Sequence, residues 1–398
     1  MIIEIILAII IGVALGTFTG LAPGIHINLV SVLIITLSPF LLTLTTPLNL
    51  AVVIVAMSVT HTFLDAIPSI YLGAPDSDEV LSVLPGHKML LQGNAYHAVV
   101  LNTIGSLASL VVIVSLVPVM IPLVVKFYPV IASYIGYILI ATSLFMILRE
   151  KQKVLVLIIF LLSGALGLGV FNLGLKDPLF PLLSGLFGIS GLLLSIKNKV
   201  KIPVQRISYP QVRKSAGFQA IAATLFSGTL TSFLPGFSSA QAAILGSSVT
   251  KNIGDEGYLI LVGGANTVNM ILSVVALYVI DKARNGSIIA VSKLLGTLTK
   301  DNLILILACI LVVGGIATIL TLKLSKVFSG IISKVNYKLL CVSIISLIIL
   351  LTFVLTGPMG FLVLVVSTSL GIIPQLKNIG RNHTMGCLLI PVILYFTL

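Results

Sequence analysis

Long apolar runs recur along the whole chain, and several exceed 18 residues. A run of that length crosses a hydrocarbon core of about 30 Å as a helix. Inside such a core only helices and closed barrels satisfy their backbone polar groups. The runs are uniformly apolar rather than alternating, so the sequence predicts an all-α polytopic membrane protein. Composition agrees, because 58% of the 398 residues are hydrophobic and only 9% are charged.

The apolar runs divide into about 14 helical segments, seven on each side of a basic linker at 197–214. The first seven are predicted at 2–20, 26–44, 48–66, 95–125, 129–148, 153–172 and 178–196. The second seven are predicted at 216–234, 237–250, 257–280, 302–322, 337–356, 359–376 and 384–398. We therefore expect a first membrane repeat at 1–196 and a second at 215–398.

The distribution of basic residues predicts the orientation. If residue 1 starts outside and every segment crosses, 17 of the 23 Lys and Arg residues fall on the inner side. Cytoplasmic loops carry such an excess of Lys and Arg. We therefore expect a cytoplasmic linker and both termini outside.

Two Pro-Gly breaks interrupt helical segments at matching places. "GTFTGLAPGIHIN" at 16–28 aligns with "GTLTSFLPGFSSA" at 228–240 and shares Gly, Thr, Thr, Pro and Gly with it. Because seven is odd, the second half would enter the membrane from the opposite side. The sequence thus predicts two inverted-topology repeats with Pro-Gly-broken helical hairpins, an architecture of secondary transporters. The alternative is that Pro-Gly breaks are common and that the five identities arose by chance.

The breaks are candidate substrate sites, since a helix that restarts after Pro-Gly points free N–H groups at an anion. Arginine is absent from the segment centres, so helix ends and hydroxyls are expected to hold the anion. The alternative is a pair of plain turns at the membrane surface. The candidate substrate-binding residues are Gly20, Pro23, Gly24, His26 and Asn28 in the first half and Pro235, Gly236, Ser238, Ser239 and Gln241 in the second.

A second set of polar residues lies within apolar segments. His61 and Asp65 are four apart and share a helix face, where they suit a coupling proton. Asn266 and Asn269 are three apart and offer oxygens to sodium or to substrate hydroxyls. The alternatives are an interfacial cap for Asp65 and helix–helix hydrogen bonding for the asparagines.

Other function classes lack their signals. The chain has no HExxH, GxSxG or GxxxxGK[ST] motif, so we expect no enzyme and no ATP-driven pump. The Lys and Arg residues are scattered, which indicates lipid headgroups rather than nucleic acid. Cys309, Cys341 and Cys387 have no ligand spacing, so neither a metal nor a cofactor is expected beyond a coupling ion, Na⁺ or H⁺.

Four motifs resemble the TctA family, the large membrane subunit of tripartite tricarboxylate transporters. They are "GLAPGIHINLVSVL", "IYLGAPDSDEVLSVLPGHKMLLQGNAYHAVVLNTIGSL" at 70–107, "GTLTSFLPGFSSAQAAILGSS" and "GGANTVNMI". The resemblance implies a carboxylate carrier in a prokaryotic plasma membrane that uses paired hairpins and an ion gradient. It also implies an extracytoplasmic binding protein and a small membrane subunit as partners, and it leaves a homodimer open.

The leading hypothesis is a secondary transporter of small organic anions, with carboxylates as the expected class and sodium or protons as the coupling ion. Access would alternate by movement of one bundle against another. A translocase of polyprenyl phosphate or another lipid carrier is the second hypothesis, because a helix-end anion site also suits a phosphate headgroup. An intramembrane enzyme that uses His61 and Asp65 is the third.

Overall fold

The computed structural model describes residues 2–22, 27–72, 83–197, 202–233, 239–250, 253–283, 285–334, 336–377 and 379–398. Within these ranges the chain is helical and contains no strand. Seven of the described helices are long and apolar enough to cross a membrane. The prediction of an all-helical, multi-pass protein is confirmed.

The helices of the first half follow one another closely. They are α1 (Ile2–Leu21), α2 (Ile27–Thr36), α3 (Ser38–Leu41), α4 (Pro47–Leu64), α5 (Ala66–Leu72), α6 (Val83–Leu91), α7 (Ala95–Ser133), α8 (Ile135–Leu148), α9 (Lys153–Asn172), α10 (Leu179–Leu183), the π-helical turn η1 (Ser184–Ile189) and α11 (Ser190–Lys197). The described part of the linker, 202–213, has no regular structure.

The second half has fewer and longer helices. They are α12 (Lys214–Phe233), α13 (Ser239–Val249), α14 (Gly254–Ile280), α15 (Gly286–Leu295), α16 (Lys300–Ile332), α17 (Tyr337–Leu376), the 3₁₀ turn η2 (Arg381–Met385) and α18 (Gly386–Thr397). Most bounds lie within a few residues of the predicted segments.

Some elements differ from the prediction for identifiable reasons. Helix α17 joins two predicted segments across a kink at Gly357, whose φ is 69° and which precedes Pro358. Helices α4 and α5 together form one apolar span over Pro47–Leu72. Helices α6 and α15 lie outside the predicted segments. Short helices that do not cross a membrane leave a weaker apolar signal than a span does.

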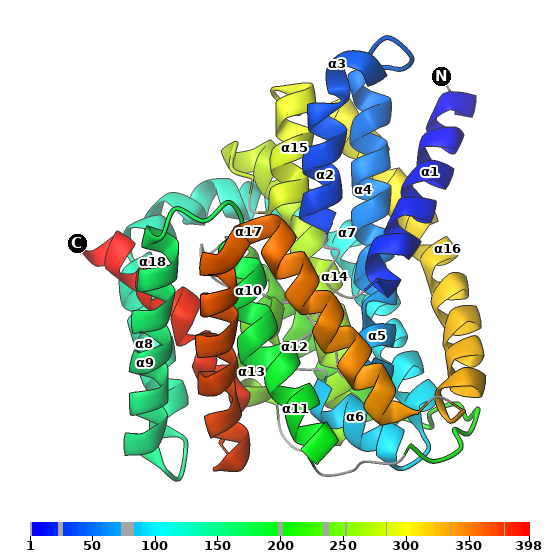
Figure 1. Cartoon of the computed structure of the whole chain (residues 1–398). Helices are drawn as coiled ribbons and strands as arrows, with labels where there is room; N and C mark the ends of the chain where they lie inside the picture. The colour runs from blue at the N-terminus through cyan, green and yellow to red at the C-terminus, as the bar shows by residue number, and fades with distance from the viewer. Residues whose placement is uncertain are drawn as a thin grey trace.

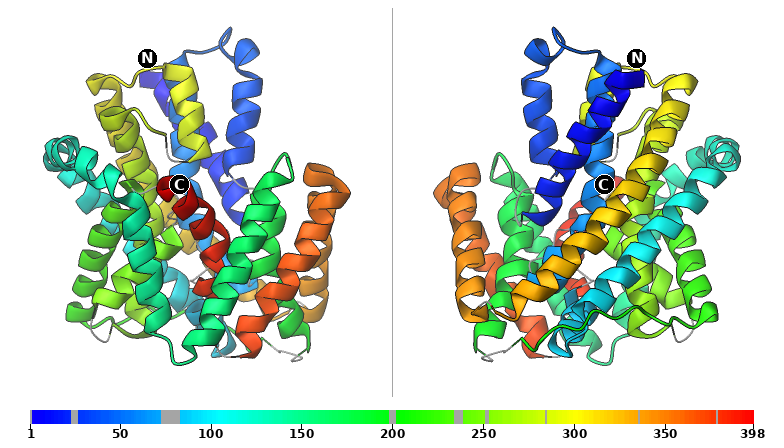
Figure 2. Two further views of the ribbon diagram at one scale, coloured as in Figure 1. Left: turned by 90° about the vertical axis from the view of Figure 1, so that its left-hand side faces the viewer. Right: turned by 90° about the vertical axis from the view of Figure 1, so that its right-hand side faces the viewer.

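The helices form two bundles (Figures 1 and 2). The large bundle contains α1–α7 and α12–α16, and the small bundle contains α8–α11, α17 and α18. One apolar core lies within the large bundle and two within the small bundle, whereas a fourth core joins side chains of both. In Figure 1, α1 begins at the top of the large bundle and the linker runs along the bottom.

Helices α4 and α14 lie at the centre of the large bundle. The most apolar window of α4–α5 is 100% buried, and that of α14 is 94% buried. Helix α4 packs against α1 and α16, while α14 packs against α7 and α12. A helix that is apolar all round belongs in such an interior.

Glycines let the backbones at these crossings approach closely, as small residues do in membrane helices. A Cβ at Gly16 of α1 would overlap the backbone of Met57, and one at Gly105 of α7 would overlap the carbonyl of Ile260 in α14. The pairs α1–α4 and α7–α14 therefore depend on the missing side chains.

The linker is held against the large bundle at the start of α7. Gln205 is buried; its Oε1 accepts from the Ala95 N–H and its Nε2 donates to the Leu90 carbonyl, each at 3.0 Å. The ammonium of Lys326 in α16 lies 5.9 Å from the centre of the Tyr209 ring. The linker is thus pinned to the ends of α6, α7 and α16.

Replacing Gly105 with alanine tests the α7–α14 crossing. The added methyl group forces two backbones apart, and overpacking of this kind costs about 1–3 kcal/mol of stability. We expect a lower midpoint of thermal unfolding for the purified protein in detergent. Gly315→Ala in α16 is the matched control, because a Cβ there meets nothing within 4 Å. Equal midpoints for the two variants would contradict the crossing.

Candidate functional site

A buried polar cluster begins where α4 gives way to α5. Asp65 ends α4, and its backbone N–H donates to the His61 carbonyl. The His61 and Asp65 side chains share a face, as predicted, with Nε2 and Oδ2 3.9 Å apart. On its other side, Nδ1 of His61 lies 3.1 Å from Oγ1 of Thr19, near the end of α1. The His–Asp pair is therefore tied to the helix that precedes the first break.

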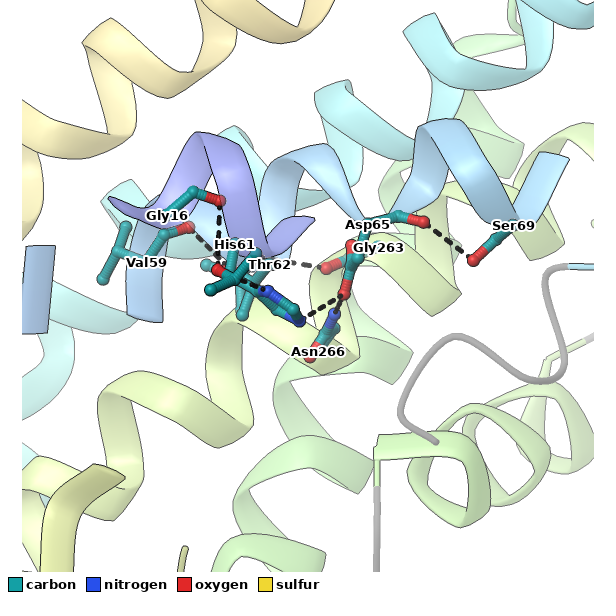
Figure 3. A network of polar contacts seen from close by, with 10 residues as sticks. Gly16, Val59, His61, Thr62, Asp65, Ser69, Gly263 and Asn266 are labelled. Atoms are coloured by element: carbon teal, nitrogen blue, oxygen red, sulfur yellow. Dashed lines mark hydrogen bonds and ion pairs between the residues drawn. The ribbon is translucent and has the colours of Figure 1, made fainter. Parts of the chain in front are cut away.

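Asn266 of α14 joins this pair from the second half of the chain. Its Nδ2 donates to Oδ2 of Asp65 at 2.8 Å. Figure 3 shows His61, Asp65 and Asn266 pointing toward one another between α4 and α14. Asp65 is 2% exposed, and His61 and Asn266 are 3% exposed. A carboxylate, an imidazole and an amide thus share one buried site.

Asn269, one helical turn further along α14, connects to the second break. Its Nδ2 donates to Oγ of Ser239, the first residue of α13, at 3.2 Å. Its Oδ1 accepts from Oγ of Ser232, near the end of α12, also at 3.2 Å. One amide therefore holds both sides of the interruption between α12 and α13.

The described residues of the first break pack closely as well. A Cβ at Gly20 would lie 2.8 Å from that of Leu64 in α4. Asn28, at the start of α2, lies against Gly286 at the start of α15, where a Cβ would be 2.7 Å from Oδ1 of Asn28. The first break is thus flanked by α4 on one side and by α15 on the other.

Six of the predicted substrate-binding residues fall outside the described part of the chain. Pro23, Gly24, His26, Pro235, Gly236 and Ser238 lie outside the described residues, and Gln241 lies in α13. Of the predicted residues that are described, the structure gathers His61, Asp65, Asn266, Asn269 and Ser239 around α4 and α14.

The cluster's chemistry suits a small ion and an oxygen-rich ligand. It offers one carboxylate, one titratable imidazole, two amides and several hydroxyls. Amides and hydroxyls both donate and accept hydrogen bonds. Among the described residues, no group of three or more His, Cys, Asp or Glu could hold a metal ion.

Three polar residues with buried or cross-helix contacts were not among the predicted site residues. Thr19 belongs to the repeated Gly-Thr-x-Thr motif, so the repeat itself could have indicated it. Ser232 carried no signal, because a serine that bonds across helices looks like any other. Arg381 lies between two predicted segments, and the structure buries it, with only 4% exposed.

Comparison with known proteins identifies the family of this chain. The family described as the tripartite tricarboxylate transporter TctA family matches residues 6–386. The chain belongs to the TctA family. An uncharacterised protein of Methanocaldococcus jannaschii is 32% identical over 407 aligned residues, which cover 98% of each chain. No solved structure matches the chain.

The predicted resemblance is confirmed, and the family match extends over nearly the whole chain. TctA is a family of transporter subunits that work in tripartite systems with a binding protein and a small membrane subunit. A multi-pass membrane protein agrees with this membership.

Replacing Asn266 with alanine tests the link between the two halves. The change removes a donor to a buried carboxylate, which costs about 1–3 kcal/mol. We expect a lower midpoint of thermal unfolding in detergent. Asn172→Ala is the control, since Asn172 is exposed at the end of α9. If both variants melt alike, the Asp65–Asn266 hydrogen bond does not join the halves.

Proposed function

We propose that this chain is the membrane carrier of a small organic carboxylate and that an ion gradient drives it by alternating access. Membership of the TctA family supports the transport of tricarboxylate-type substrates. The observation that carries the proposal is the buried Asp65–Asn266 hydrogen bond, 2.8 Å long, beside the ends of both broken hairpins. A transporter subunit of this kind is not an enzyme.

The buried carboxylate explains why an ion would be needed. A carboxylate of the substrate and the carboxylate of Asp65 repel each other strongly where water is scarce. A proton or a sodium ion at Asp65 removes that repulsion. Ionisable residues at membrane depth commonly mark such ion pathways. His61, 3.9 Å from Asp65, is the second group that could carry a proton, and the amide oxygens of Asn266 and Asn269 suit sodium.

The neighbouring helix starts are the proposed contacts of the anion. Helices α2 and α13 begin at Ile27 and Ser239, three residues after the glycines of the Pro-Gly sequences. A helix N-terminus carries a partial positive charge and free N–H groups. We assign substrate binding to the residues of both breaks, namely Gly20, Pro23, Gly24, His26 and Asn28 together with Pro235, Gly236, Ser238, Ser239 and Gln241.

The division into inverted repeats at 1–196 and 215–398 is part of the proposal. Corresponding elements make corresponding contacts, since α1 packs on α4 and α12 packs on α14. Both hairpins are interrupted at matching places, as in carriers built from inverted repeats. Movement of the large bundle against the small bundle would then open the site to each side in turn.

We further propose a plasma-membrane location with both termini outside, where an extracytoplasmic binding protein delivers the substrate. The basic linker, at the end opposite the start of α1, then faces the cytoplasm (Figure 1). A small membrane subunit completes the complex, and two copies of the chain can form a homodimer.

Uptake by the full complex in proteoliposomes tests the function. We expect accumulation of radiolabelled di- or tricarboxylates when a sodium or a proton gradient is imposed. Asp65→Asn should lower coupled uptake roughly tenfold or more, because a charge-linked interaction is worth about 1.5–3 kcal/mol. Asp255→Asn is the control, since Asp255 is exposed and pairs with Lys88 at the surface.

Two results would overturn the proposal. Uptake of Asp65→Asn at the rate of the unchanged protein, under either gradient, would remove Asp65 from the coupling site. Absence of uptake for every carboxylate, with transfer of a polyprenyl phosphate instead, would identify a lipid-carrier translocase. Comparing the sodium gradient with the pH gradient identifies the ion.

A further inference from the structure

Arg381 is a buried guanidinium that the proposed transport site does not use. It begins η2, the 3₁₀ turn between α17 and α18. Its Nη2 donates to the carbonyls of Leu186 and Phe187 in η1 and to Oγ of Ser190. The Phe187 ring centre lies 5.7 Å from the guanidinium carbon. All of these partners are neutral.

No acidic side chain of the described residues forms an ion pair with Arg381. The acid bound to the same turn, Glu150, pairs instead with His383, at 3.0 Å. Burial lowers the pKa of Arg381 to about 10, so the guanidinium stays charged at neutral pH. A buried charge without an opposite charge is costly and is rarely kept without a reason.

The hydrogen bonds to η1 and Ser190 involve only part of the Arg381 guanidinium. An arginine has five N–H donors, and every hydrogen bond that Arg381 makes to the described residues comes from Nη2. The buried Nε has no partner in the described part of the chain. Had Arg381 served only to satisfy the carbonyls of the π-helical turn, a neutral amide donor would suffice without the cost of a buried charge.

A glycine and two polar side chains lie next to the guanidinium of Arg381. Gly191 faces it, and a Cβ there would lie 3.4 Å from Nη1 and 3.9 Å from Oε1 of Gln375. Nε2 of Gln375 donates to Oγ of Ser190, which also accepts from Arg381. An amide and a hydroxyl therefore lie next to the positive charge, as in sites that bind carboxylates.

The turn that holds Arg381 lies at the seam between the two bundles. Within the small bundle, η2 packs against α9, α17 and α18. It also contacts α13 of the large bundle, the helix whose first residue, Ser239, bonds to Asn269. A charge at this seam can meet an anion that the large bundle carries past it.

We propose that Arg381 is an anion-binding residue of the small bundle that pairs with a carboxylate of the transported substrate. This inference rests on the proposed carboxylate transport and adds a contact outside both Pro-Gly breaks. The anion supplies the opposite charge that the described residues do not provide. The guanidinium in turn selects carboxylates over neutral molecules of the same shape, since it forms charge-assisted hydrogen bonds only with the anion.

Ligand-induced thermal stabilisation and uptake kinetics of the full complex test this proposal together. Citrate and succinate are the probes, and their neutral amides are the comparison ligands. We expect both acids, but not the amides, to raise the unfolding midpoint of the unchanged protein. Arg381→Gln should abolish this rise and increase KM for uptake by roughly ten- to a hundredfold, the range for a hydrogen bond to a charged group. Arg149→Gln is the control, because Arg149 is exposed at the end of α8.

A purely structural arginine would give a different pattern. Arg381→Gln would then melt earlier without ligand but keep the full rise with citrate or succinate and an unchanged KM, which would overturn the inference. Should Arg381→Gln fail to fold, Arg381→Lys replaces it, because lysine keeps the positive charge. For this variant we expect a smaller ligand-induced rise of the unfolding midpoint and a higher KM for uptake than in the unchanged protein. An unchanged protein that neither takes up nor responds to any carboxylate would overturn the proposed function itself.

Discussion

The hydrogen bond from Asn266 to Asp65 is the contact on which the interior of the large bundle depends. It is 2.8 Å long, is buried, and joins α4 of the first half to α14 of the second. Both helices are enclosed by others over nearly their whole length. A carboxylate at such a place requires a partner, because neither lipid nor apolar side chains replace its water. The packing of α4 against α14 and the position of the Asp65 carboxylate therefore depend on each other.

The broken hairpins follow from the same constraint. Each interruption frees backbone groups that must find partners away from lipid. Beside the second interruption, the side chains of Ser232 and Ser239 hydrogen-bond to the side chain of Asn269. At the first interruption, Thr19 meets His61 and Asn28 meets Gly286. Side chains of the two central helices, His61 and Asn269, thus contact the helix ends that flank the breaks.

Local sequence patterns predicted the helices and the polar faces well, because both depend on spacing along the chain. The four-residue spacing of His61 and Asp65 and the three-residue spacing of Asn266 and Asn269 placed each pair on one face. The Asp65–Asn266 bond joins residues 201 apart and depends on how α4 and α14 cross, which no local pattern specifies. The burial of Arg381 was not predicted for a similar reason, since a short polar stretch between predicted spans looks like a solvated loop whether or not it folds inward.

Two buried charges of opposite sign lie in different bundles, Asp65 in the large one and Arg381 in the small one. Under the proposed function their roles are complementary. The carboxylate of Asp65 excludes an anion until a cation or proton arrives, which couples the substrate to the ion. The guanidinium attracts the anion and belongs to the bundle against which the site moves. Because the carboxylate repels the bare anion and the guanidinium attracts it, the substrate is expected to leave Asp65 only after the ion has left.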